Sequence, residues 1–88
     1  MTAVPELLVY TVPNCADCEA MKRLLAQQGA AFIERNLRTD PTALPELQRR
    51  FDLRIAPVTV IDGQVLFGPF EQQRPQVLAA LARRTASP

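Results

Sequence analysis

The sequence contains no histidine and only two cysteines, and these absences narrow the chemistry that the chain can carry. A structural zinc site takes about four nitrogen or sulfur ligands, so the two thiols of one chain do not complete one. No apolar stretch approaches the roughly 18 to 20 residues that cross a bilayer. The net charge of +1 creates no field that would select nucleic acid or an anionic membrane. We therefore expect neither nucleic acid nor a membrane as a partner.

Glycine is also scarce, with three residues, and the eight prolines form no repeat or low-complexity tract. A length of 88 residues suits one small core, so we expect residues 1–88 to form a single domain. The first ten residues hold Pro5 and Glu6 rather than the basic start and apolar run of a secretory leader. We expect a cytoplasmic protein, and in that compartment a cysteine pair is more often catalytic or metal-binding than structural.

What the sequence does contain is a CxxC motif, in which Ala16 and Asp17 separate Cys15 from Cys18. The motif follows an apolar, β-branched run over 7–12, which is typical of a strand buried on both faces. From Cys15 the apolar residues take helical spacing, up to a capping glycine at 29. The two thiols are therefore predicted at the start of a helix that follows a strand, where open α/β sheets place their active sites.

Strands and helices are predicted to alternate along the rest of the chain: an edge strand over 32–37, a helix over 40–50, strands over 57–61 and 64–67, and a helix over 72–84. Asp40 and Pro41 favour the start of the first of these helices, on which Glu46 is expected to be exposed. Asp62 and Gly63 favour a type I′ hairpin between the two strands. The order βαβαββα predicts an α/β fold with a four-stranded mixed sheet and helices on both faces.

The position of the motif gives its two thiols different roles. The thiolate is the nucleophile in thiol–disulfide exchange, and the free N–H groups and positive dipole of a helix start stabilise it on Cys15. Cys18 lies one turn further on the same side, from which it can attack a mixed disulfide. We therefore predict that Cys15 is the nucleophile and Cys18 the resolving thiol of a site with no built-in cofactor.

Asp17 is expected to tune this pair. Its carboxylate suits the first turn of a helix, but it disfavours a second negative charge on Cys15 nearby. We therefore expect a Cys15 thiol that is less acidic than it would be between neutral residues. We also expect a more reducing couple, because a destabilised thiolate favours the disulfide.

Two other interpretations of the cysteines stay open beside exchange chemistry. The same thiols could bind an iron–sulfur cluster or another metal in a carrier, if two copies of the chain each supplied ligands. They could also be small apolar side chains in an interaction domain that has lost its reactivity. The CxxC spacing after a strand favours exchange over both.

Three stretches of the sequence, YTVPNCADC, AMKRLL and IAPVTVIDGQVLFG, resemble the glutaredoxin and thioredoxin superfamily. The resemblance covers nearly the whole chain and is strongest to glutaredoxins and to the small glutaredoxin-like hydrogen donors of ribonucleotide reductase. It implies a thioredoxin-like fold of the glutaredoxin type and a dithiol oxidoreductase that reduces disulfides in proteins or small molecules. It also implies a cis bond before Pro57, with the backbone of Ala56 pairing with a bound peptide or glutathione beside Cys15. We expect this protein to be a monomer.

A substrate-binding surface around the cysteines follows from the same resemblance, and it comprises Val12, Pro13, Asn14, Ala56, Pro57 and Gly68. Glutaredoxins that bind glutathione usually carry a lysine near Val12 and a second glycine after Gly68, where this chain has Pro69. Loss of the cation and of a backbone donor predicts weak glutathione binding. We therefore expect protein disulfides as substrates and a flavoprotein of the thioredoxin-reductase type, rather than glutathione, as the electron donor.

Two phenylalanines near the predicted site admit two interpretations. Phe67 and Phe70, with Val12, could form an apolar rim that docks protein partners. At this spacing, however, the two aromatic residues are more often part of the core, which is the interpretation we favour for them.

Overall fold

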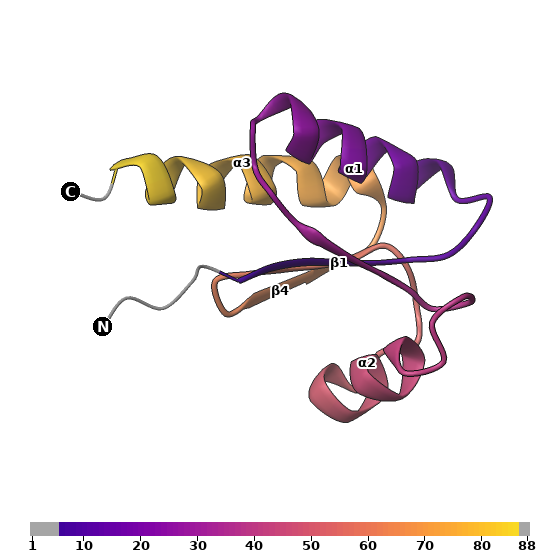
Figure 1. Ribbon diagram of the computed structural model, residues 1–88. Coiled ribbons are helices and arrows are strands. Elements are labelled where there is room, and N and C mark those ends of the chain that lie inside the picture. The colour runs from indigo at the N-terminus through magenta and orange to yellow at the C-terminus, as the bar shows by residue number, and fades with distance from the viewer. Residues whose placement is uncertain (1–5, 87–88) are drawn as a thin grey trace.

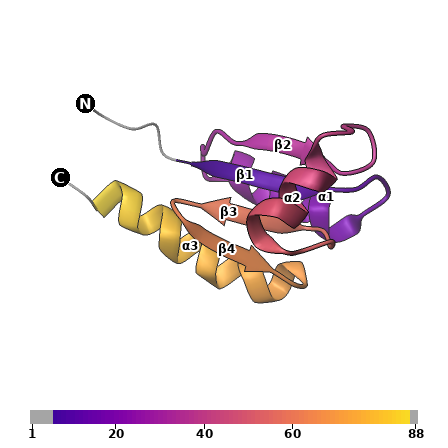
Figure 2. The same ribbon diagram turned by 90° about the horizontal axis from the view of Figure 1, so that it is seen from below.

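The sheet of the protein is built on β1 (Leu7–Thr11), of whose five residues four are buried. The computed structural model describes residues 6–86. β1 pairs in parallel with β2 (Ile33–Asn36) and antiparallel with β3 (Val58–Ile61), and β3 pairs antiparallel with β4 (Gln64–Phe67). The strand order is β2-β1-β3-β4, as Figure 2 shows from the side of α2. The predicted four-stranded mixed sheet, with an edge strand near residues 32–37, is confirmed.

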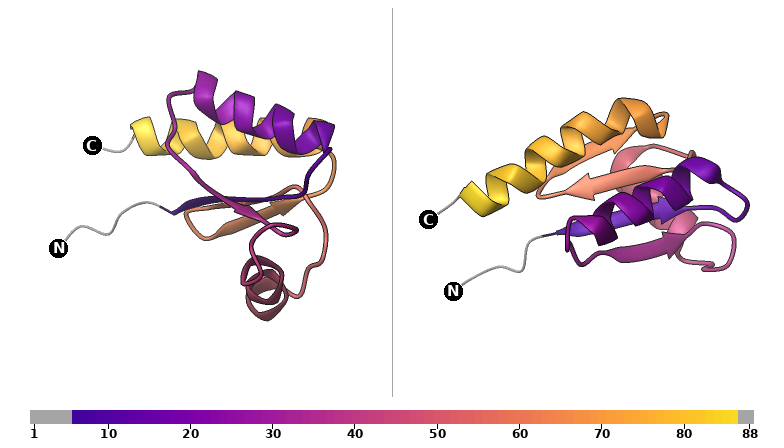
Figure 3. Two further views of the ribbon diagram at one scale, coloured as in Figure 1. Left: turned by 45° about the vertical axis from the view of Figure 1, so that its right-hand side comes forward. Right: turned by 90° about the horizontal axis from the view of Figure 1, so that it is seen from above.

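Helices cover both faces of this sheet (Figure 1). α1 (Ala16–Gln27) and α3 (Phe70–Ala86) lie on one face, and α2 (Ala43–Phe51) lies on the other. Figure 3 shows α1 over β1 and β2, and α3 over β3 and β4. The predicted order βαβαββα and the fold class are confirmed. None of the helices within residues 6–86 has the length and apolar character needed to cross a membrane.

Each face of the sheet has its own apolar core. The core under α1 and α3 contains the fully buried side chains of Val9, Met21, Leu25, Ile61 and Val77. The core under α2 contains Tyr10, Leu47, Val58 and Val60. Burial of one such side chain stabilises the fold by about 1.5–3 kcal/mol, so β1 and β3 are held firmly between the two layers. The chain runs from the end of β1 to Cys15, and Pro57 directly precedes the start of β3.

Two helix starts differ from the sequence-based prediction. α2 begins at Ala43 rather than at Asp40, because Asp40 accepts the N–H of Thr42 at 2.9 Å and its hydroxyl at 2.7 Å in a turn that precedes the helix. α3 begins at Phe70 rather than at residue 72, and a carboxylate from α1 binds its first N–H. The hairpin between β3 and β4 turns at Asp62 and Gly63, whose φ angles of 48° and 90° are both positive, as a type I′ turn requires.

The prediction that Glu46 is exposed is wrong. Its carboxylate accepts a hydrogen bond from the hydroxyl of Tyr10 and one from Arg35 Nη2 at 2.9 Å, while Arg35 also binds Asp40 at 2.8 Å. Burial and the hydrogen bond to Glu46 raise the pKa of Tyr10 to about 12. The hydrogen bond from Tyr10, followed by those from Arg35, lowers the pKa of Glu46. A polar cluster thus ties α2 to β1 and β2.

Candidate active site

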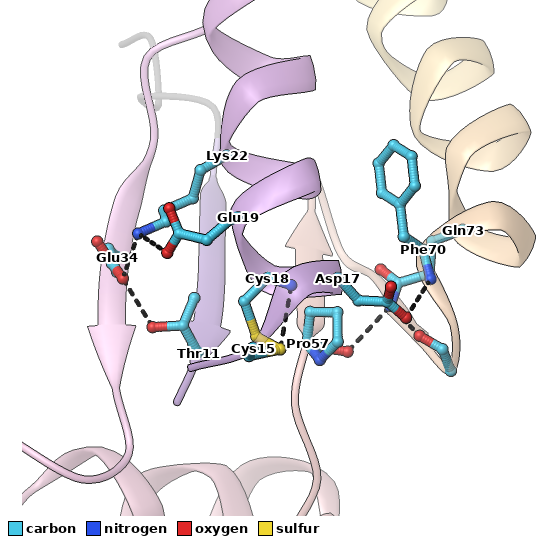
Figure 4. The surroundings of a disulfide bond; sticks show 11 residues. Thr11, Cys15, Asp17, Cys18, Glu19, Lys22, Glu34, Pro57, Phe70 and Gln73 are labelled. Atoms are coloured by element: carbon cyan, nitrogen blue, oxygen red, sulfur yellow. Dashed lines mark hydrogen bonds and ion pairs between the residues drawn. A yellow bond between two sulfur atoms is a disulfide. The ribbon is translucent and has the colours of Figure 1, made fainter. Parts of the chain in front are cut away.

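Cys15 and Cys18 form a disulfide at the start of α1 (Figure 4). Their Cα atoms lie 5.2 Å apart. Cys15 is the N-cap residue, with extended backbone, and its Sγ accepts the N–H of Cys18 at 3.1 Å. The sulfur thus takes up one of the N–H groups that a helix start leaves without a partner. The same contact is able to stabilise negative charge on Cys15 when the disulfide is reduced.

The two sulfur-bearing residues differ in exposure. Cys18 has no exposed surface, whereas Cys15 is partly exposed. Thiol–disulfide exchange needs direct access of one sulfur to another, so an external partner meets Cys15 first. This difference supports the predicted order, in which Cys15 attacks and Cys18 resolves.

The residues before the motif form an exposed approach to the disulfide. Val12 is half-buried, and Pro13 and Asn14 are exposed. Asn14 has a φ angle of 57°, a left-handed conformation that asparagine tolerates better than most residues. The turn at Asn14 lets the chain reverse from the end of β1 into α1.

Pro57 lies beside the disulfide in Figure 4 and is buried. The register of β1 with β3 pairs Tyr10 with Val58, so Pro57 stands at the end of the sheet from which the cysteine loop leaves. The bond between Ala56 and Pro57 is cis, as the resemblance implied. Because proline has no N–H, it brings no backbone donor to the sulfur atoms.

Gly68 reaches the same end of the sheet from β4, since Phe67 pairs with Val58. Its φ angle is 105°, a conformation that favours glycine. A Cβ atom there would stand 3.1 Å from Oε1 of Gln72, whose side chain is exposed. The structure therefore brings Val12, Pro57 and Gly68 to the end of the sheet that carries the disulfide, and their contacts with a substrate stay a prediction.

Asp17 directs its carboxylate toward α3 (Figure 4). Its Oδ2 accepts the N–H of Phe70, the first residue of α3, at 3.1 Å. A carboxylate is favourable at this positive end of a helix, which accounts for the early start of α3. Sequence reasoning missed the contact because it joins residues 53 positions apart. The tuning of Cys15 by Asp17 stays a prediction.

Gln73 is a fully buried polar residue of α3 beside this site. Its Nε2 donates to the carbonyl oxygen of Pro57 at 2.9 Å and to that of Gly68 at 2.8 Å. Its Oε1 accepts the hydroxyl of Thr59 at 2.8 Å. Sequence reasoning missed Gln73, although it precedes the buried Val77 by four positions and so lies on the apolar face of its helix.

A second polar cluster lies between α1 and the outer strand. Glu34 accepts the hydroxyl of Thr11 at 2.7 Å and binds Lys22 at 3.1 Å, while Lys22 binds Glu19 at 2.9 Å. The hydrogen bond from Thr11, followed by that from Lys22, lowers the pKa of Glu34. The hydrogen bond to Glu19 is the main cause that raises the pKa of Lys22. Because two carboxylates share one ammonium group, this cluster keeps one formal negative charge.

The two phenylalanines near the site differ from each other. Phe67 is 55% exposed, so the core interpretation is wrong for it. Phe70 is half-buried and packs against the core under α1 and α3, as favoured. Ile55, just before the Ala56–Pro57 bond, is 46% exposed. Among residues 6–86, no group of three histidine, cysteine, aspartate or glutamate side chains is arranged to hold a metal ion.

Comparison with known proteins agrees with this geometry. The family model for glutaredoxin matches residues 7–66. The crystal structure of the thioredoxin-like protein BC3987 is similar at 31% identity and a TM-score of 0.73, over 81% of this chain and 97% of that chain. Buckwheat glutaredoxin in complex with glutathione is similar at 20% identity and a TM-score of 0.68, over 90% of this chain and 78% of that chain. Glutaredoxin 1 from Francisella tularensis, in complex with cacodylate, has 19% identity and a TM-score of 0.65, over 90% and 99%.

The fold and the cysteine pair thus define a thioredoxin-like redox protein. The match to more than half of the chain shows further that the chain belongs to the glutaredoxin family. The two neighbours near 20% identity support the fold alone. A search of curated proteins finds no match. Family and disulfide together support a thiol–disulfide oxidoreductase in general.

Proposed function

We propose that the protein reduces disulfides, chiefly those of other proteins, through Cys15 and Cys18. The observation that carries this proposal is the disulfide at the start of α1, with one sulfur accessible and the other buried. A thiolate on Cys15 receives the N–H of Cys18, and the resolving sulfur is already within bonding reach of it. In the cytoplasm, where thiols are kept reduced, Cys15 and Cys18 would return to the dithiol form between turnovers.

The reaction has two steps, and each step breaks one sulfur–sulfur bond and forms another. The Cys15 thiolate attacks the substrate disulfide, and one substrate sulfur leaves as a thiolate that takes up a proton. The resulting mixed disulfide is attacked by Cys18, which has given up its proton, and the second substrate sulfur leaves and is protonated. The substrate gains two electrons and two protons, and the protein is left with the Cys15–Cys18 disulfide.

The surface around the disulfide suits an extended polypeptide. The backbone of Ala56 lies two residues before β3, where it could pair with a substrate strand beside the cysteines. The exposed side chains of Phe67 and Ile55 flank this position and offer apolar contacts. Val12, Pro13 and Asn14 would form the other wall of the substrate-binding surface. One copy of the chain supplies all of these residues, so we propose that a monomer is active.

The choice of electron donor rests on what the site offers to glutathione. Val12 supplies no cation for a carboxylate, and Pro69 supplies no N–H. The N–H of Phe70, at the start of α3, is already bound to the Asp17 carboxylate. A small anionic thiol would have to displace that carboxylate, which supports a flavoprotein of the thioredoxin-reductase type as the donor.

Turnover of a protein disulfide with NADPH tests the proposal in two coupled systems. One contains thioredoxin reductase, and the other contains glutathione and its reductase. We expect turnover mainly in the first, complete loss in Cys15→Ser, and a trapped mixed disulfide on Cys15 in Cys18→Ser. Full activity of Cys15→Ser would refute the mechanism. Fast turnover through glutathione alone would overturn the choice of donor and leave the mechanism standing.

A further inference from the structure

Beside the disulfide, the side chain of Gln73 replaces a backbone hydrogen bond between the ends of β3 and β4. The ladder of β3 and β4 pairs Val58 with Phe67, so the next pair along would set Pro57 opposite Gly68. Pro57 has no N–H, and the carbonyl of Gly68 therefore cannot receive a bond from it. Nε2 of Gln73 donates to both carbonyl oxygens instead, at 2.9 Å and 2.8 Å. The amide group thus joins the two strands at the point where the backbone ladder stops.

The Gln73 amide is held in one orientation. Its side chain has no exposed surface, and its oxygen accepts the hydroxyl of Thr59, itself fully buried, at 2.8 Å. All three hydrogen bonds join protein atoms directly, and no buried side-chain nitrogen or oxygen of the described residues lacks a partner. Removal of the amide would leave two carbonyl oxygens of the site without this donor, and an unpaired buried polar group is costly. The two segments are therefore fixed to α3 through one residue.

We propose that Gln73 is a positioning residue for disulfide exchange, which holds the Ala56–Pro57 turn and Gly68 in register with the disulfide. The inference rests on the proposed function, because its purpose is to present the Ala56 backbone to a substrate. An extended polypeptide pairs with that backbone, whereas a small disulfide needs only the accessible sulfur of Cys15. Gln73 thus favours polypeptide disulfides over small ones without touching either.

Single-turnover oxidation of the pre-reduced protein tests this role, with no dependence on the electron donor. The substrates are a peptide with an internal disulfide and hydroxyethyl disulfide, and the variants are Gln73→Met and Thr59→Val. Thr59→Val is the matched control, because it removes one hydrogen bond of the same amide but leaves both carbonyl bonds. We expect Gln73→Met to raise the half-saturating peptide concentration at least fivefold, with the limiting rate and the rate with hydroxyethyl disulfide within twofold of wild type. Thr59→Val should change none of these.

Backbone amide exchange gives a second readout that does not depend on activity. Gln73→Met should speed amide exchange at Val58. Thr59→Val should leave it unchanged when the two variants are equally stable to urea. If the two variants behave alike in kinetics and in exchange, the residue is merely structural and the inference is wrong. If the wild type reduces no disulfide, the proposed function fails and the exchange data alone decide whether Gln73 holds these segments. If Gln73→Met does not fold, the double variant Gln73→Met/Thr59→Val replaces it, because this variant removes the buried amide and its hydroxyl partner together. If the double variant does not fold either, Gln73 is needed for folding and the positioning role is rejected.

Discussion

Replacement of Asp17 tests two effects of its carboxylate, the capping of α3 and the repulsion of a thiolate on Cys15. The carboxylate caps α3 through the N–H of Phe70, and it also stands in the dipeptide between the cysteines. Loss of a helix cap costs about 0.5–2 kcal/mol, and loss of the negative charge at a helix start costs about 0.3–1 kcal/mol more. Asp17 is half-buried, so we expect Asp17→Ala to destabilise the oxidised protein by about 1–2 kcal/mol. For a domain of this size, the melting temperature falls by about 4–8 °C for each kcal/mol.

The reduced protein should lose less stability than the oxidised one. It loses the same cap, but it is relieved of the repulsion between the carboxylate and the Cys15 thiolate. If that repulsion is worth about 0.7 kcal/mol, the reduced form gains that amount relative to the oxidised form. The potential of the couple then rises by about 15 mV, because about 30 mV corresponds to 1.4 kcal/mol for two electrons. The wild-type couple is the more reducing one.

Urea unfolding of both redox forms and equilibration with a glutathione redox buffer measure the two effects independently. Asp17→Asn is the matched control, since it keeps an acceptor for Phe70 and loses the charge. It should retain most of the cap and show the full change in potential. Equal destabilisation of both redox forms by Asp17→Ala, with an unchanged potential, would show that Asp17 is only a cap. No loss of stability in the oxidised form would instead refute the cap itself.

Three further predictions concern Glu46, Tyr10 and Gly68. Glu46→Gln should cost about 1–2 kcal/mol near neutral pH, as expected for a partly exposed acceptor of charged hydrogen bonds. Folding lowers the pKa of Glu46, so its contribution to stability is full above the ordinary carboxyl pKa of 4.5 and is lost as the pH falls below it. The urea unfolding curves of variant and wild type should therefore converge in acid and diverge above about pH 5. The neutral phenol of Tyr10, with a pKa of about 12 against 10.0, adds stability that is lost between those values, and Tyr10→Phe should remove that alkaline decline. Gly68→Ala should cost about 1–3 kcal/mol of stability, because the φ angle of Gly68 is 105°, and it should weaken peptide reduction. Gly29→Ala is the control: at a φ angle of 67° with open space around it, it should cost about 1 kcal/mol and leave reduction unchanged. Equal effects of the two variants on reduction would contradict a place for Gly68 in the site.

The fold could be predicted from the sequence because its signals are local. Apolar runs over 7–12 and 57–61 mark the two central strands, and Asp62 with Gly63 marks the hairpin between β3 and β4. Helical spacing after Cys15 marks α1 and its cap. The disulfide follows from the same local information, since two cysteines three positions apart at a helix start have few other arrangements.

The contacts that organise the site could not be predicted in this way, because they join elements that are distant in sequence. From the sequence, Asp17 is an ordinary acidic residue in the first turn of α1, but in the structure it caps α3. Glu46 reads as a solvent-facing residue of α2, yet it binds Tyr10 and Arg35. Their partners depend on the packing of helices onto the sheet, which local propensity does not encode.

The starts of two helices, α1 and α3, meet at the disulfide end of the sheet, and they are used differently. The start of α1 gives an N–H to the Cys15 sulfur, where a thiolate forms. The start of α3 gives the N–H of Phe70 to Asp17, a charge that the chain supplies itself. The first of these positive ends therefore serves the reacting sulfur, and at the second a carboxylate on a substrate would compete with Asp17 for the N–H of Phe70. This arrangement supports recognition through the backbone at Ala56 and the exposed Phe67 rather than through the charge of a small thiol.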